Sequence, residues 1–415
     1  MKINLHQSIR WLLVLSLLIL AVGCEYDGPV NAWEEARKKT PVVPTITQVL
    51  PEDAATASEI TIIGQDFASD SDGNIVYFDN VQATIKSATS TEIVVFRPNI
   101  TGDSLIIKVV ADGAVGLAKY TKSYALAPVV EPFGIFIDTD LIAAVAVTPS
   151  ENLYVTMGDA AGTILRLTPE GRRDDSYVAE GDKFASDMKM APDGSIYFIR
   201  KQNRIYRVAP EGGEGEIILT LGRNDKVKFF DFDENGNLYA GGEETSLVVV
   251  RPDLSFTNLG LLPAYDIQTV RVYSGAVYVG AIFSDDPEGA PNGIIGGIWK
   301  YPISDATGTL GAGELVLDWG QTGSFADSEL KDLTFSEEGQ MYIACTDSIP
   351  LLTLNMDGTV SPYYLGLIDP PIDKLIWGSG NYLYAIVNRR VAKSDGGLLL
   401  KINMGKASAP YYGRK

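Results

Sequence analysis

Asn235-Gly236-Asn237-Leu238-Tyr239 is the stretch that decides the fold, because variants of it recur through the last two thirds of the chain. Each variant ends in an apolar residue and a tyrosine, and five of the six follow a turn-rich run. The pairs are Leu153-Tyr154, Ile196-Tyr197, Leu238-Tyr239, Val277-Tyr278, Met341-Tyr342 and Leu383-Tyr384. Their tyrosines are 43, 42, 39, 64 and 42 residues apart. This period, with short alternating runs and no helical periodicity, predicts the blades of a β-propeller.

Six tyrosine pairs predict six blades. The 64-residue interval indicates an insertion in one blade, between Ser284 and Gly297, and long loops in compact repeats are usually functional. The stretch 133–137 precedes the first repeat, and we expect it to pair with the last blade and close the ring. These units resemble NHL repeats over residues 128–415. The resemblance implies a propeller and no particular activity.

A smaller all-β segment precedes the propeller. Short β-rich runs at 60–63, 75–78, 93–96 and 105–110 alternate with turn clusters, which favours an antiparallel sandwich. With Pro44-Thr45-Ile46, Leu50-Pro51 and Ile60-Thr61-Ile62-Ile63-Gly64-Gln65-Asp66-Phe67, residues 44–127 resemble an IPT/TIG domain, which has an immunoglobulin-like fold. That family usually serves as a spacer or a binding module.

The N-terminus has the pattern of an export signal. Lys2 and Arg10 flank an apolar run at residues 11–22, which suits a signal peptide and is shorter than a membrane-spanning helix needs. The run ends in Leu20-Ala21-Val22-Gly23-Cys24, which resembles the bacterial lipobox. We therefore expect residues 1–23 to be cleaved and Cys24 to be lipidated, with residues 24–43 as a tether.

The residues after Cys24 bear on its destination. Glu25-Tyr26-Asp27 resembles the acidic signal that sends lipoproteins of glycan-degrading Gram-negative bacteria to the cell surface. We expect a lipid anchor in the outer membrane with the chain on the outside. A periplasm-facing location is the alternative.

Composition narrows the chemistry. The chain has 53 acidic and 34 basic residues and a net charge of −19, which disfavours nucleic acid as a partner. The only histidine, His6, leaves with the signal peptide, and Cys345 is the only cysteine besides Cys24. Zinc sites and Ser-His-Asp or Cys-His catalysis therefore cannot be built, and no metal or cofactor is expected.

The first strand of each blade lines the channel of a propeller. Counting ten residues back from the repeat tyrosines places Asp187, Asp332 and Lys374 there. A solvated channel with compensating charges is one interpretation of these residues. A site for a small ligand or a cation is the other.

The loops that lead into each blade, and those between its second and third strands, share one face of a propeller. Stacking aromatics and polar groups on that face would suit a sugar ligand, although each aromatic has inter-blade packing as its alternative. The candidate ligand-binding residues are Tyr177, Tyr265, Phe283, Asp285, Asp286, Trp319, Phe325, Arg389 and Arg390.

The sequence thus predicts a non-enzymatic surface lipoprotein with a sandwich stalk and a propeller head. By resemblance to lipid-anchored IPT/TIG proteins that accompany glycan import systems, the expected ligand is a polysaccharide and an outer-membrane transporter is a possible partner. Protein binding or envelope scaffolding is the first alternative. A carboxylate-dependent glycosidase or lyase is the second.

Overall fold

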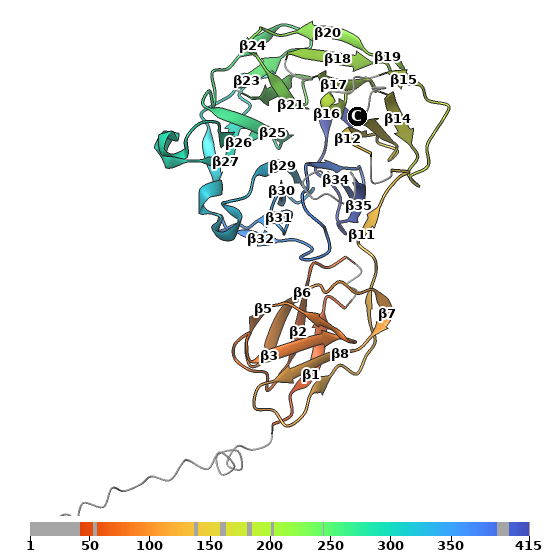
Figure 1. The fold of residues 1–415 in the computed structure, drawn as a ribbon, viewed down its shortest axis with the longest axis vertical. Coiled ribbons are helices and arrows are strands. Elements are labelled where there is room, and N and C mark those ends of the chain that lie inside the picture. Colours follow the sequence, from red (N-terminus) through yellow and green to blue (C-terminus); the bar gives the residue numbers. More distant parts are fainter. Residues whose placement is uncertain are drawn as a thin grey trace, which may run out of the picture.

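The protein is built from β-strands in two parts, a small sandwich and a ring of sheets (Figure 1). The computed structural model describes residues 42–52, 56–136, 140–157, 163–180, 185–200, 203–243, 245–387 and 398–414. Within them the elements are strands and short 3-10 helices, which confirms the predicted all-β class. No helix in these ranges is long and apolar enough to cross a membrane. The predicted signal peptide and Cys24 lie outside the described residues.

The sandwich packs two antiparallel sheets against each other. One sheet has the order β1-β2-β6-β5 and the other β4-β3-β8-β9, beside a pair β10-β7. Their bounds are β1 (Thr45–Leu50), β2 (Glu59–Gln65), β3 (Asn74–Phe78), β4 (Val81–Ala83), β5 (Ile85–Ala88), β6 (Glu92–Phe96), β7 (Gly102–Leu105), β8 (Ile107–Ala111), β9 (Ala118–Lys119) and β10 (Tyr124–Leu126).

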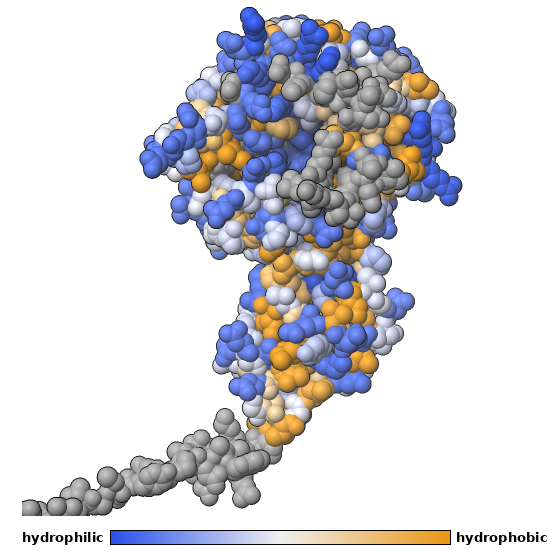
Figure 2. Space-filling view, viewed as in Figure 1, coloured by the Kyte–Doolittle hydropathy of each residue, from blue (hydrophilic) through white to orange (hydrophobic). Residues whose placement is uncertain are grey.

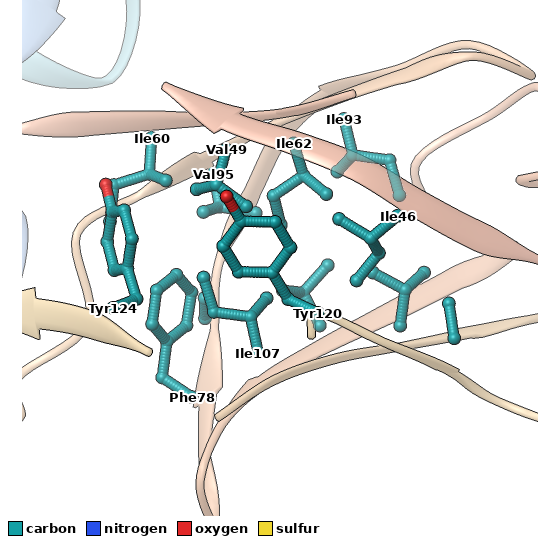
Figure 3. Packing of buried hydrophobic residues seen from close by; sticks show 14 of the residues in the cluster. Ile46, Val49, Ile60, Ile62, Phe78, Ile93, Val95, Ile107, Tyr120 and Tyr124 are labelled. Carbon is teal, nitrogen blue, oxygen red and sulfur yellow. The ribbon is translucent and has the colours of Figure 1, made fainter. Parts of the chain in front are cut away.

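Alternation along these strands makes the core of the sandwich. Ile60 and Ile62 of β2 are fully buried and lie opposite Val95 and Ile93 of β6. Phe78 of the other sheet closes the same core from the facing side (Figure 3). Successive side chains of a strand point to opposite faces, so each apolar set is gathered between the sheets.

The described residues of the ring form six sheets, which confirms the six predicted blades. From the channel outward, the first strands are β12 (Ile142–Val147), β16 (Ala185–Met190), β21 (Val227–Phe232), β25 (Tyr265–Tyr273), β29 (Leu330–Phe335) and β33 (Lys374–Trp377). The second strands are β13 (Leu153–Met157), β17 (Ile196–Arg200), β22 (Leu238–Gly242), β26 (Ala276–Phe283), β30 (Met341–Cys345) and β34 (Tyr382–Val387). Every repeat tyrosine lies in a second strand.

The outer strands complete the blades. The third strands are β14 (Thr163–Leu167), β18 (Arg204–Val208), β23 (Thr245–Val250), β27 (Gly296–Pro302), β31 (Leu351–Leu354) and β35 (Leu398–Asn403). The fourth are β15 (Ala179–Glu180), β20 (Glu216–Thr220), β24 (Phe256–Asn258), β28 (Glu314–Asp318), β32 (Val360–Pro362) and β11 (Val130–Pro132), with β19 (Gly213–Glu214) parallel to β15. The 3-10 helices are η1 (Pro287–Gly289), η2 (Pro291–Gly293), η3 (Trp319–Gln321), η4 (Gly323–Phe325) and η5 (Tyr412–Arg414).

The ring is closed by a strand from the beginning of the propeller. β11 pairs with β35, so that the last blade takes its outer strand from residues 130–132. The prediction that a strand before the first repeat closes the ring is confirmed. Its position at 133–137 is wrong, because the pairing strand is at residues 130–132. Only the N–H of Phe133 still continues the pairing, to Leu399. At Gly134 φ is +89°, which turns the chain away from the sheet.

Extra residues of the fourth blade are distributed over several connections. The predicted insertion lies between β26 and β27, where η1 and η2 project from the ring (Figure 1). The connections at 303–313 and 319–329 are also long, and the second contains η3 and η4. The 64-residue interval therefore reflects three loops and not a single insertion.

The sandwich meets the ring at its rim, beside β11 and β32 (Figure 1). The hydroxyl of Tyr364, from the connection after β32, lies 2.7 Å from the carbonyl oxygen of Thr56 and 2.6 Å from that of Asn403. Tyr364 is 1% exposed. The contact ties the sandwich to the last blade, and neither face of the ring lies beneath the sandwich.

Replacing Tyr364 by phenylalanine should therefore weaken this junction. The single O–H that serves two partly buried carbonyl groups is lost, so we expect the free energy of unfolding to fall by about 1–2 kcal/mol. Urea denaturation measures the change. Tyr382→Phe is the control, since Tyr382 is 37% exposed and its substitution should have little effect. Equal stability of the two variants would contradict the assigned role of Tyr364.

Candidate functional site

The central channel has two sets of side chains at equivalent places on the first strands. We call the end where these strands begin the loop face and the end of the turns after them the turn face. Ring 1, nearer the loop face, pairs with the residue two places after each repeat tyrosine and contains Ala144, Asp187, Phe229, Thr269, Asp332 and Lys374. Ring 2 pairs with the tyrosines themselves and contains Ala146, Lys189, Asp231, Arg271, Thr334 and Ile376.

Between the two rings the strands carry apolar residues. These are Val145, Met188, Phe230, Val270, Leu333 and Leu375, all buried. Since side chains alternate along a strand, this set packs between blades while rings 1 and 2 face away from that packing. In the space-filling view, hydrophilic residues lie around the hollow at the middle of the ring (Figure 2).

Three channel aspartates connect neighbouring blades. A carboxylate oxygen of Asp187 accepts the N–H of Phe230, 3.1 Å away on the next first strand. Asp231 accepts the N–H of Val272 at 2.8 Å. Asp332 accepts the N–H of Leu375 at 2.9 Å. Each carboxylate also accepts the N–H of the residue that follows it. The aspartates therefore have a structural task at the inner edges of the blades.

Cations balance these carboxylates. The ammonium of Lys189 lies 2.6 Å from Asp187, and Nη2 of Arg271 lies 3.1 Å from Asp332. Arg271 also donates to the carbonyl oxygens of Leu333 and Leu375, each at 2.8 Å. With Lys374, the described channel residues of the two rings contain three cations and three carboxylates, so their formal charges cancel.

Burial shifts the pKa values of several side chains in the channel. It lowers the pKa of Lys374 to about 8, although Asp187 and Asp332 act in the opposite direction. Burial also raises the pKa of Asp231, and the nearby charges of Arg271 and Lys189 do not fully offset it. For Asp187, burial alone would raise the pKa, but Lys189 and Lys374 outweigh it and the pKa lies below its usual range.

A cavity of about 70 Å³ lies between ring 2 and the C-terminal segment. All six ring 2 residues line it, with residues 408–411 on the turn-face side. The segment is held on one side by the N–H of Ala409, which donates to the carbonyl oxygen of Phe335 at 3.0 Å. On the other, the hydroxyl of Tyr411 donates to the carbonyl oxygen of Met190 at 3.0 Å. The segment thus crosses the turn-face end of the channel.

The structure brings the predicted channel residues together. Asp187, Asp332 and Lys374 all belong to ring 1, and their charges act on one another. Counting back from Tyr278 indicated residue 268, whereas Thr269 takes that place, because the turn at Ser274-Gly275 is shorter than the others. Ring 2 was missed, although its residues are simply those that pair with the tyrosines that define the repeat.

The predicted aromatic platform is wrong for four of its five members. Tyr265, Trp319 and Phe325 lie near the loop face but are 5%, 2% and 7% exposed. The hydroxyl of Tyr265 donates to the carbonyl oxygen of Ile294 at 3.0 Å, and Nε1 of Trp319 donates to that of Ser328 at 2.7 Å. Only Phe283 stays half-buried, with its ring centroid 5.6 Å from that of Tyr265.

Tyr177 lies at the opposite end of its blade. Its ring centroid is 4.9 Å from that of Tyr154, which directly follows the turn between β12 and β13. Tyr177 is therefore near the turn face, and at 7% exposure it packs between blades. The sequence pattern located the outer connection of this blade but not the end at which it lies.

Of the four polar residues predicted to bind a ligand, the structure describes two. Asp285 and Asp286 are exposed on the insertion, where Asp286 accepts the N–H of Glu288 at 3.2 Å and begins η1. Arg389 and Arg390 lie outside the described residues. The insertion therefore presents a small acidic surface, to which Glu288 also contributes.

The candidate reactive side chains of the described residues are the channel carboxylates and Cys345. The channel carboxylates accept backbone N–H groups, and those of Asp187 and Asp332 also contact cations. Cys345 is fully buried, and burial raises the pKa of its thiol to about 11. No group of three or more His, Cys, Asp or Glu side chains in the described ranges is arranged to hold a metal ion. What the channel does offer is a set of fixed donors and acceptors.

Comparisons with known proteins agree with the fold. The family model "IPT/TIG domain" matches residues 44–125, which confirms the resemblance predicted for the sandwich. No curated protein matches the chain.

Several solved structures are similar in fold. A protein of unknown function from Bacteroides thetaiotaomicron is 14% identical, with a TM-score of 0.48 and coverage of 88% of this chain and 98% of its own. An auxiliary nutrient binding protein from the same organism is 11% identical, with a TM-score of 0.47 and coverage of 88% and 98%. A gluconolactonase from Xanthomonas campestris is 13% identical, with a TM-score of 0.46 and coverage of 66% and 95%. At such values these likenesses carry no argument about the ligand or activity of this chain.

Proposed function

We propose that this chain is a non-enzymatic, lipid-anchored protein of the outer-membrane surface whose propeller binds a glycan at the loop-face end of its channel. The observation that carries the proposal is the state of the channel aspartates. Asp187, Asp231 and Asp332 each accept two or more hydrogen bonds from the protein and sit beside cations. Carboxylates held in this way are poor general acids and bases, but they keep neighbouring donors and acceptors rigid.

The charge balance of the channel favours an uncharged polar ligand. A sugar hydroxyl both donates and accepts, so it suits a channel that contains ammonium, guanidinium and carboxylate groups. In ring 1, Lys374 lies with its ammonium 3.6 Å from the ring centroid of Phe229, and both side chains are only half-buried. We infer that a glycan end contacts this pair, with the Lys374 ammonium as donor and Phe229 as the apolar face.

The lipid anchor and the sandwich would place the propeller at the cell surface. Cys24 would attach the chain to the membrane, and the sandwich would act as a spacer. Since the sandwich meets the ring at its rim, it covers neither the loop face nor the turn face. A glycan at the loop face could then be passed to an outer-membrane transporter beside the protein.

Binding measurements against a panel of polysaccharides test the proposal. Calorimetric titration should find at least one that binds, and size analysis after incubation should show that it has not been shortened. Failure of every polysaccharide to bind would overturn the glycan proposal. Shortening of any of them would overturn the non-enzymatic one.

Lys374→Gln should weaken binding of that polysaccharide about tenfold, since a charge-assisted hydrogen bond is lost. Lys300→Gln is the matched control, because Lys300 lies on the third strand β27 and is no part of either ring. Equal affinities of the two variants would contradict the role of Lys374.

The affinity of the unmodified protein should also fall as the pH rises through about 8, where the Lys374 ammonium loses its proton. Because this pKa is below the 10.5 of an unperturbed lysine, Lys374 makes the fold more stable, not less, as the pH rises from about 8 to 10.5. Its titration therefore cannot weaken binding by unfolding the protein. A pH-independent affinity between 7 and 9 would contradict the assignment.

Protein binding is the second candidate function, and the insertion favours it. Asp285, Asp286 and Glu288 are exposed on a long loop that projects from the ring. Such a surface suits a basic partner. Reversing these charges should abolish partner binding and leave glycan binding unchanged.

A further inference from the structure

The cavity beside ring 2 is lined by hydrogen-bond donors and acceptors that the protein itself does not fully use. The Lys189 ammonium has three donors, and Asp187 takes one of them. Arg271 donates from Nε and Nη2, while its Nη1 has no hydrogen-bond partner among the described residues. Both side chains line the cavity and are about one tenth exposed, at 10% and 12%. Two cations therefore present free donors to the same small space.

An acceptor and a hydroxyl face this space as well. Each carboxylate oxygen of Asp231 accepts one backbone N–H and keeps a free lone pair. The hydroxyl of Thr334 makes no hydrogen bond to another described residue. Since burial raises the pKa of Asp231, its carboxylate gains from a further donor that enters the cavity.

The remaining walls are apolar and set the size. Val147, Met190, Ile376 and Trp377 line the cavity, and residues 408–411 bound it on the turn-face side. The cavity's volume of about 70 Å³ suits a molecule of two or three carbons.

We propose that this cavity is a second binding site, for a small carboxylate that has a hydroxyl or amino donor on the adjacent carbon. The carboxylate lies between Lys189 and Arg271, which supply charge-assisted hydrogen bonds. The donor on the next carbon points to Asp231. The carbon atoms pack against the apolar walls. This ligand uses the free groups of Lys189, Arg271 and Asp231, and its carboxylate also accepts the O–H of Thr334.

The site is separate from the proposed glycan site. No ring 1 residue lines the cavity, and neither Lys374 nor Phe229 is part of it. Binding of a small acid and binding of a polysaccharide are therefore independent measurements, and failure of one leaves the other standing.

The experiment titrates the full-length chain with ¹³C-labelled glycolate and glycine, followed by NMR line broadening and calorimetry. We expect binding in the millimolar range or tighter for at least one of the two, and its identity tells whether the donor is a hydroxyl or an ammonium. Glycolamide, the neutral analogue of glycolate, should bind at least about tenfold more weakly because it lacks the carboxylate.

Three substitutions at Thr334 test whether the acid binds in this cavity. Thr334→Ser keeps the hydroxyl, and its affinity should stay close to that of the unmodified protein. Thr334→Val is isosteric and lacks the hydroxyl, so we expect a loss of about fivefold. Thr334→Leu adds volume to the cavity, and we expect binding to be lost.

The outcomes are decisive. No binding of either acid would overturn the proposal, and so would equal affinity for glycolamide. Unchanged binding by the leucine variant would place the acid elsewhere. If thermal melting shows that the leucine variant does not fold, the valine variant and the glycolamide comparison still decide.

Discussion

Replacement of Asp332 by alanine is expected to lower the free energy of unfolding by about 3–5 kcal/mol, the cost typical of breaking a buried ion pair from one side. Asp332 is 1% exposed and accepts hydrogen bonds from Thr269, Arg271, Leu333 and Leu375. Its loss leaves the Arg271 guanidinium without its carboxylate and the Leu375 N–H without an acceptor. The first consequence acts between the fourth and fifth blades and the second between the fifth and sixth.

Urea denaturation followed by tryptophan fluorescence measures this change. Asp285→Ala is the matched control, because Asp285 is exposed on the insertion and its carboxylate accepts a hydrogen bond from the N–H of the next residue. The control should stay within about 0.5 kcal/mol of the unmodified protein. A loss below about 1 kcal/mol in Asp332→Ala would show that the channel carboxylates do not connect the blades.

Removal of β11 should have a comparable effect, because it opens the ring. We propose that residues 128–415 fold without the sandwich, and that a chain starting at residue 134 folds with a lower stability. The shorter chain loses the pairing of β11 with β35, including the bonds from Phe133 to Leu399 and from Asn403 to Val129. At about 1 kcal/mol for each hydrogen bond, about 4 kcal/mol is lost. The newly exposed edge of β35 also invites pairing with another chain.

The comparison of the two fragments isolates the closing strand, since both lack the sandwich. Thermal melting should give a midpoint about 10 °C lower for the chain that starts at 134. Light scattering should show that this chain self-associates. Equal midpoints would mean that the contacts between blades 6 and 1 at the turn face, such as that of Glu151 with Ser379 and Gly380, are sufficient for closure.

The architecture could be predicted from the sequence because the residues that define the repeat are those that pack between the blades. The repeat tyrosines lie in the second strands, and the channel residues follow from their register. Ring 1 could be located in this way at Asp187, Asp332 and Lys374. Ring 2 could have been found by the same counting, because its members are the direct partners of the tyrosines.

The surface was harder to predict from sequence. Tyr265, Trp319 and Phe325 have the composition of a stacking platform, but the loops of the fourth blade fold back over them. A single sequence does not reveal such burial, because an aromatic side chain fills an inter-blade gap as readily as it binds a sugar. The cavity could not be predicted from the sequence either, because the C-terminal segment that bounds it has no repeat pattern. Only its contacts with Phe335 and Met190 bring it across the channel.

The central claim is that a glycan binds at the loop-face end of the channel, and hydrogen–deuterium exchange with a bound polysaccharide tests it most directly. The account predicts slower exchange in the loop-face segments 222–227, 264–269 and 370–375, with no change in the sandwich or in residues 405–411. Protection confined to the sandwich or to the turn face would contradict it.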